Sequence, residues 1–167
     1  MSARAAEHDI VVRRPDPARI EEEALAAMRV QRAAMRHALP GLREPHSAAR
    51  DREWIRGVFA RHSVWLACVG SDVVGIASRH GDWLHQLYVA PGYMGRGIGQ
   101  RLLDRALAEQ PALQLWTFSR NEGARRFYER NGFVAVEFGD GSGNEECEAD
   151  VRYVKGPLAS AAPSREK

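Results

Sequence analysis

Three glycines at alternate positions, Gly95, Gly97 and Gly99, mark the segment of the chain with the clearest chemical signature. They lie between residues 83–89, which are rich in strand-forming side chains, and an amphipathic helix predicted to begin near residue 98. Glycine allows the backbone to turn tightly and to bring its N–H groups close to an anion. The first turn of the following helix adds unpaired N–H groups and the positive end of the helix dipole. This combination predicts a site for a pyrophosphate group.

The spacing of these glycines argues against two common nucleotide-binding motifs. The segment lacks the GxxxxGK sequence followed by Ser or Thr that defines a P-loop, and it lacks the GxGxxG of a dinucleotide-binding unit. A glycine-rich turn between a strand and a helix is also compatible with tight packing alone. A second motif is therefore needed before the turn can be assigned a ligand.

That second motif follows about twenty residues later. The segment YVAPGYMGRGIGQRLL at 88–103, followed by NEGARRFYERNGF at 121–133, resembles the GCN5-related N-acetyltransferase (GNAT) superfamily. The first segment is similar to the acetyl-CoA loop of the family, usually Q/R-x-x-G-x-G/A, and the second to its Asn…Phe-Tyr…Gly-Phe segment. The resemblance extends over most of the chain and is specific over 83–133. One departure is Met94, which stands where the family usually has Gln or Arg.

The resemblance implies that acetyl-CoA is the co-substrate and that its acetyl group passes directly to a primary amine of a small molecule or peptide, without a metal. The residues implied to bind acetyl-CoA are Leu87, Tyr88, Val89, Met94, Gly95, Arg96, Gly97, Ile98, Gly99, Gln100, Asn121, Phe127 and Tyr128. If Met94 acts through its backbone N–H, the departure is tolerated; otherwise Arg96 must supply the missing contact to phosphate.

Tyr128 is implied to lie near the sulfur of CoA and to protonate the thiolate as it leaves. A phenol with an ordinary pKa of ~10 is able to donate a proton in such a step. The alternative is that Phe127 and Tyr128 both belong to the core of the helix, with the hydroxyl simply hydrogen-bonded.

His85 is the candidate base that takes the proton of the amine. Strand alternation predicts that His85, Leu87 and Val89 share one face of their strand, and the resemblance implies that Val89 lies beside the acetyl group. An imidazole with an ordinary pKa of ~6.5 accepts a proton near neutral pH, directly or through water. The alternative is a structural histidine at the edge of the sheet.

Asn121 and the acidic loop at 145–150 are candidates for further contacts with CoA and with the acceptor. Asn121 matches a family position that contacts CoA, and it is equally suited to cap the helix that follows. The loop at 145–150 contains four acidic residues, which would attract a cationic acceptor if they border the amine site. The alternative for this loop is a solvated surface.

Composition excludes several other classes of function. The 167 residues carry 24 Lys and Arg against 22 Asp and Glu, so the net charge of +2 gives no reason to expect a nucleic-acid partner. Cys68 and Cys147 have no metal-ligand spacing, and neither is expected to act as a nucleophile.

No segment approaches the ~20 apolar residues of a membrane span, so we expect a cytoplasmic protein without a membrane partner. A homodimer is compatible with the chain.

The elements that must position these residues form a mixed α/β (α+β) domain. The predicted order is β-α-α-β-β-β-α-β-α-β-β, with a central, mostly antiparallel sheet of about seven strands flanked by about four helices. We expect a flexible terminus at 1–8, a single GNAT-like domain at 9–155 and a disordered tail at 156–167.

Two alternative functions remain open on the same fold. One is a non-catalytic acyl-CoA-binding sensor, and the other is an O-acyltransferase. Tyr128 and the complete glycine turn favour an enzyme over a sensor, whereas nothing in the sequence identifies the acceptor.

Overall fold

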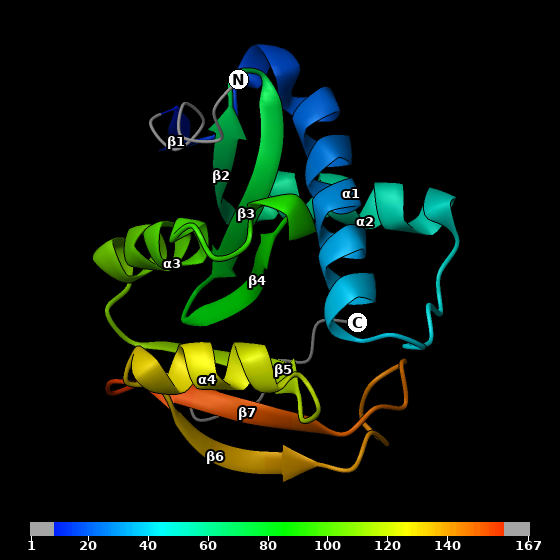
Figure 1. The fold of residues 1–167 in the computed structure, drawn as a ribbon, viewed down its shortest axis with the longest axis vertical. Helices are drawn as coiled ribbons and strands as arrows, with labels where there is room; N and C mark the ends of the chain where they lie inside the picture. Colours follow the sequence, from blue (N-terminus) through cyan, green and yellow to red (C-terminus); the bar gives the residue numbers. More distant parts are fainter. Residues whose placement is uncertain (1–8, 159–167) are drawn as a thin grey trace.

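A computed structural model describes residues 9–158 of the chain, and seven strands within this range form one sheet in the order β1-β2-β3-β4-β5-β7-β6 (Figure 1). The predicted terminus at 1–8 and residues 159–167 of the predicted tail lie outside the described residues. The strands are β1 (Ile10–Arg13), β2 (Ser63–Val69), β3 (Asp72–His80), β4 (Trp83–Val89), β5 (Leu113–Phe118), β6 (Val134–Gly139) and β7 (Asp150–Lys155). The helices are α1 (Ile20–Ala38), α2 (Ala48–Arg61), α3 (Ile98–Glu109) and α4 (Glu122–Arg130). The predicted order of elements is confirmed.

Strands β4 and β5 form the only parallel pair described in the sheet, and they separate along their length. Their register consists of one pair of residues, Trp83 with Gln114, at the amino-terminal ends of both strands. All other neighbours in the described sheet are antiparallel and pair over four or more residues. The carboxyl ends of β4 and β5 therefore leave an opening in the middle of the sheet (Figure 1).

Helices cover both faces of the sheet. On one face, α1 and α2 pack against β2 and β3 through an apolar cluster that includes Ala27, Ile55 and Ile76. On the other face, α3 and α4 pack through a larger cluster that includes Leu102, Leu115 and Tyr128. Helices α1 and α3 each bury an apolar stripe, as the 3.6-residue periodicity predicts, whereas α4 buries Tyr128 and partly buries Ala124 and Phe127.

Side-chain caps mark the starts of α2, α4 and the short 3-10 turn before α1. The side chain of Asp16 accepts a hydrogen bond from the backbone of Ala18, and Ser47 and Asn121 cap α2 and α4 in the same way. A short 3-10 turn at Pro17–Arg19 precedes α1, which begins at Ile20. Such caps satisfy N–H groups that have no partner within the helix.

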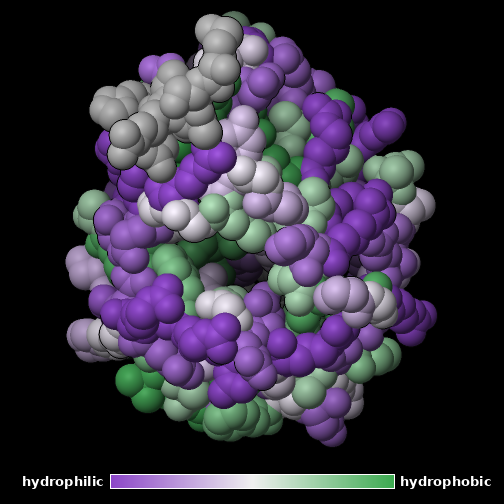
Figure 2. Space-filling view, in the orientation of Figure 1, coloured by the Kyte–Doolittle hydropathy of each residue, from purple (hydrophilic) through white to green (hydrophobic). Residues whose placement is uncertain are grey.

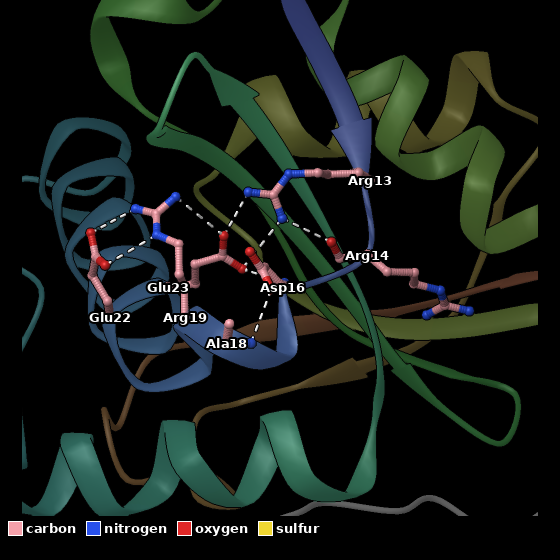
Figure 3. A network of polar contacts seen from close by, with 7 residues as sticks. All are labelled: Arg13, Arg14, Asp16, Ala18, Arg19, Glu22 and Glu23. Atoms are coloured by element: carbon pink, nitrogen blue, oxygen red, sulfur yellow. Dashed lines mark hydrogen bonds and ion pairs between the residues drawn. The ribbon is translucent and has the colours of Figure 1, made fainter.

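A buried carboxylate joins the start of α1 to β1. Glu23 is 1% exposed, and its oxygens accept hydrogen bonds from the guanidinium of Arg13 at 2.6 Å and the backbone N–H of Asp16 at 2.8 Å (Figure 3). The guanidinium of Arg19 stands 3.9 Å from the same carboxylate. A buried charge is tolerated only when it is paired in this way. The network fixes the first turn of α1, and with it the direction in which the rest of the helix runs across the sheet.

Candidate functional site

A cavity of about 1410 Å³ occupies the opening between β4 and β5. Its walls come from α1, α2, the 41–46 segment, the glycine turn, α4 and the loop between β6 and β7. Residues from both faces of the sheet line it, including Met28 from the α1 side and Phe127 from the α4 side. Figure 2 shows the surface hollowed near the centre of the face viewed. The opening thus connects the two faces of the sheet through one continuous cavity.

Ten of the predicted site residues line this cavity. They are His85, Leu87, Tyr88, Val89, Met94, Gly95, Gly99, Asn121, Phe127 and Tyr128. They come from three segments separated in sequence, which are β4, the glycine turn and the start and end of α4. The structure therefore brings together most of the set that the sequence predicts.

The glycine turn has the backbone conformation that only glycine adopts without strain. Gly95 and Gly97 have φ angles of +75° and +74°, and Gly97 is the residue that precedes the first turn of α3. A Cβ atom built at either position would meet no atom within 4 Å. The backbone is consequently uncovered on the side where a ligand would approach, at a helix end with unpaired N–H groups. This geometry fits a pyrophosphate group.

Four predicted contact residues are placed differently. Ile98 is 1% exposed and belongs to the core under α3. Arg96 folds back over the ring of Tyr93, 5.2 Å from its centroid, and donates to the carbonyl oxygen of Gly92. Gln100 donates to the side chains of Asp104 and Asn131. Gly97 is the fourth residue of this set, and none of the four lines the cavity. A contact between these residues and a phosphate would therefore be made by their backbone, or by a side chain after it rotates.

Tyr128 lies at the floor of the cavity, and its ring is held by aromatic neighbours. It is 7% exposed and packs edge-on against Phe127 and Phe133, with ring centroids 5.4 and 5.5 Å away. Within residues 9–158, no side chain or backbone group accepts or donates a hydrogen bond at its hydroxyl, in contrast with Tyr153, which donates to Glu129 at 2.7 Å. Burial and the nearby phenol of Tyr88 raise the pKa of Tyr128 well above its ordinary value. The group is therefore neutral, protonated and open to the cavity.

Tyr88 of β4 and Glu146 of the loop between β6 and β7 both line the cavity. Burial and the carboxylate of Glu146 raise the pKa of Tyr88 to about 12. Other acidic side chains of the wall have close basic partners, since Glu145 contacts the His46 ring and Asp51 pairs with Arg32. Within the described part of the chain, Glu146 forms no ion pair closer than 4.0 Å. The sequence predicts an acidic loop at 145–150, but only the structure identifies Glu146 as the glutamate of this loop that lines the cavity without an ion-pair partner among the described residues.

The predicted face of His85 is wrong, because β4 contains a bulge. Gln86 pairs with Ser78 and Leu84 with Arg79, so His85 is an extra residue opposite β3. Leu84 therefore belongs to the same apolar cluster as Leu87, and His85 lies on the opposite face, next to Gln86. A bulge reverses the alternation of side chains for the residues beyond it. His85 still lines the cavity, but from the side of α1 and α2.

Asn121 and the cysteines complete the set of predicted residues. Asn121 lines the cavity while its Oδ1 accepts from the backbone of Ala124 at 3.2 Å, so the cap leaves its amide group available. Cys68 is 1% exposed, and burial raises the pKa of its thiol. Neither Cys68 nor the exposed Cys147 lines the cavity.

Two kinds of feature are absent from residues 9–158. No three His, Cys, Asp or Glu side chains in this range come close enough together to hold a metal ion. None of the helices in the same range is both long enough and apolar enough to cross a membrane.

Comparison with known proteins places these features in a family. The model of the acetyltransferase (GNAT) domain matches residues 60–135, which contain β4, the glycine turn and α4. An uncharacterised N-acetyltransferase of Archaeoglobus fulgidus is 30% identical over 101 residues, which cover 51% of this chain and 68% of that protein. A probable N-acetyltransferase of Mycobacterium tuberculosis is 38% identical over 80 residues, which cover 42% of this chain and 46% of that protein. The chain thus spans about half the length of this curated relative.

The fold is also that of solved acetyltransferases. The PaiA N-acetyltransferase of Thermoplasma acidophilum, solved in complex with coenzyme A, superposes with a TM-score of 0.58 at 17% identity, covering 86% of this chain and 97% of that one. At this identity the likeness establishes the fold, and the sequence match establishes the family. The chain belongs to the GNAT family of acetyltransferases.

Proposed function

We propose that the protein transfers the acetyl group of acetyl-CoA directly to a primary amine of a small molecule or peptide. The observation that carries this proposal is the single cavity that extends from the glycine turn to Tyr128 and on to Glu146. Its two ends suit two different substrates, since one is a cluster of backbone N–H groups and the other contains a carboxylate.

The co-substrate side rests on the glycine turn. The open backbone at Gly95 and Gly97, next to the amino end of α3, fits the pyrophosphate of acetyl-CoA. Val89 and Phe127 line the path from this turn to Tyr128. The coenzyme A that is bound to the related Thermoplasma acidophilum protein supports the same assignment.

Three groups then have separate roles in the transfer. The amine must lose a proton before its nitrogen forms a bond with the carbonyl carbon, and His85 and Glu146 are the candidate bases on the acceptor side. The bond between that carbon and sulfur then breaks, and the hydroxyl of Tyr128 supplies a proton to the thiolate. The free hydroxyl and raised pKa of Tyr128 suit this role, because the group stays protonated until the leaving group needs it.

The test combines binding with turnover. Calorimetry should show binding of acetyl-CoA, and a CoA-release assay against amines, lysine peptides and matched alcohols should identify the acceptor. We expect release with at least one amine and none with the alcohol of the same skeleton. Binding without release for any acceptor would favour a sensor, and release with alcohols alone would favour an O-acyltransferase.

A further inference from the structure

Four polar side chains form a hydrogen-bonded chain that runs from the end of α2 across β3 and β4 to α1. His62 Nδ1 lies 3.4 Å from Ser78 Oγ, which donates to Gln86 Oε1 at 3.0 Å. Gln86 Nε2 in turn donates to Gln31 Oε1 at 2.8 Å. The chain joins the end of α2, two neighbouring strands and α1, and it ends at Gln31, which lines the cavity.

The middle of this chain is buried among apolar side chains. Ser78 is 0% exposed and Gln86 is 2% exposed, and Val64, which pairs with Ser78 on the neighbouring strand, belongs to the apolar cluster of α1 and α2. A polar group in such a place is destabilising unless its hydrogen bonds are made. Every donor and acceptor in the chain is consequently constrained by its neighbour, and no link can reverse alone.

The direction of the chain decides which group of Gln31 is left for the cavity. The single hydroxyl proton of Ser78 goes to Gln86 Oε1, so His62 Nδ1 must donate to Ser78. Gln86 then has only its amide N–H groups for Gln31, which uses its own oxygen to accept. What remains on Gln31 is its whole NH₂ group, together with the second lone pair of the oxygen that accepts from Gln86.

Gln31 lines the same cavity as the proposed reacting groups His85, Tyr128 and Glu146. Gln86 and Tyr88 are two residues apart on the same face of β4, about 7 Å along a strand. Tyr88 interacts electrostatically with both Glu146 and Tyr128. A group bound to Gln31 would therefore share this cavity with an amine placed near Tyr88.

We propose that Gln31 is a specificity-determining residue that donates a hydrogen bond to a carbonyl or hydroxyl oxygen next to the acceptor amine. Gln86, Ser78 and His62 are positioning residues, which hold the Gln31 amide with its NH₂ group toward the cavity. This inference rests on the proposed function for the location of the amine, and it adds the requirement for an oxygen on the acceptor.

The experiment measures binding rather than turnover, so that it does not depend on catalysis. The dissociation constants of glycinamide, ethanolamine and ethylamine are measured by NMR titration on the full chain saturated with CoA. Glycinamide carries a carbonyl, ethanolamine a hydroxyl and ethylamine neither. We expect the wild type to bind at least one of the two oxygen-bearing amines roughly 5-fold or more tightly than ethylamine, the size expected for one buried hydrogen bond.

Four variants distinguish the loss of the Gln31 N–H donor from a general change in packing. Gln31→Leu removes the amide, and Gln31→Glu keeps an oxygen for Gln86 but has no N–H to donate, so both should lose the preference. Gln86→Met breaks the chain without touching the ligand and should weaken the preference. Gln114→Met is the matched control, because Gln114 is another buried glutamine, 1% exposed, that takes no part in the chain; it should keep the preference.

The outcomes also separate this inference from the proposed function. Equal binding of the three amines by the wild type, including no measurable binding of any, overturns the role of Gln31. A preference that survives in both Gln31 variants overturns it as well. If the preference is found and lost as expected but no amine releases CoA from acetyl-CoA, the proposed function fails and the oxygen site remains.

Discussion

The imidazole rings of His62 and His85 lie 4.8 Å apart between centroids, on the face of β4 that is opposite to Leu87 and Val89. The bulge at His85 creates this contact, because it directs His85 and Gln86 to the same side of the strand. A base at this position would approach the amine from the side of α1 and α2, whereas Tyr128 approaches the thioester from the side of α4.

The first prediction concerns His85 as the base. His85→Ala and His85→Gln should lower kcat/KM and flatten the acidic limb of its pH profile, because the titrating imidazole is removed. His37→Gln is the control, since His37 also lines the cavity but lies away from the His62 pair. If both His85 variants keep the wild-type acidic limb, the limb belongs to another group.

Glu146 provides the second prediction. Glu146→Gln should raise KM for cationic acceptors by roughly 5-fold and reduce its dependence on salt, because an unpaired carboxylate at the cavity wall attracts cations. KM for acetyl-CoA should not change. Glu145→Gln, whose carboxylate is already held by His46, should have little effect, and an equal effect of the two variants would contradict a specific role for Glu146.

Tyr128 is tested by removal of one atom. Tyr128→Phe should reduce kcat by ~10²–10⁴-fold, the usual contribution of a general acid, while acetyl-CoA binds with wild-type affinity. Tyr153→Phe removes a hydroxyl that is used only within the protein, so it should change stability rather than kcat. Wild-type turnover by Tyr128→Phe, under conditions where chemistry limits the rate, would show that another group or water protonates the thiolate.

A negative charge introduced at the glycine turn tests whether the turn binds pyrophosphate. Gly97→Asp places a carboxylate where pyrophosphate should lie, and Gly97→Asn places a neutral side chain of nearly the same shape at the same φ of +74°. Both substitutions strain the backbone alike, so a larger loss of acetyl-CoA affinity with Asp isolates the electrostatic effect. Calorimetry measures the affinity, and equal affinity of the two variants would argue that no phosphate lies at this turn. Gly70→Asp controls for backbone strain at a distant turn with φ of +57°.

The raised pKa of Tyr88 predicts a loss of stability at high pH. Its pKa is about 12 in the folded protein and ~10 in an unfolded chain, so the unfolded state loses its proton first as pH rises. The stabilisation is complete below about pH 10 and is lost toward pH 12, by about 1.4 kcal/mol per pH unit. Denaturant unfolding at pH 9 and pH 11 should show a smaller fall in the free energy of unfolding for Tyr88→Phe than for the wild type. An identical fall in both proteins would show that the phenol is more hydrated than its position in the cavity wall suggests.

Local sequence determines the elements and the glycine turn. Asp16, Ser47 and Asn121 cap helices through bonds to N–H groups two or three residues ahead, and such short-range interactions can be read from the chain. The positive φ angles of Gly95 and Gly97 likewise belong to positions where the sequence offers no side chain. Because β4, the turn and α4 each have a local pattern of this kind, the sequence identifies the three segments that supply the predicted cavity residues.

Only the tertiary structure decided how these segments face one another. The bulge at His85 depends on the register between β3 and β4, and strand alternation alone cannot reveal an inserted residue. Glu146 acts on Tyr88 of β4, which lies 58 residues earlier in the chain, and Gln31 accepts a hydrogen bond from Gln86 of β4, which lies 55 residues later. Such contacts arise because β4 and β5 diverge and let side chains from α1, β4, α4 and the β6–β7 loop reach one cavity, a consequence of packing that no local pattern in the chain encodes.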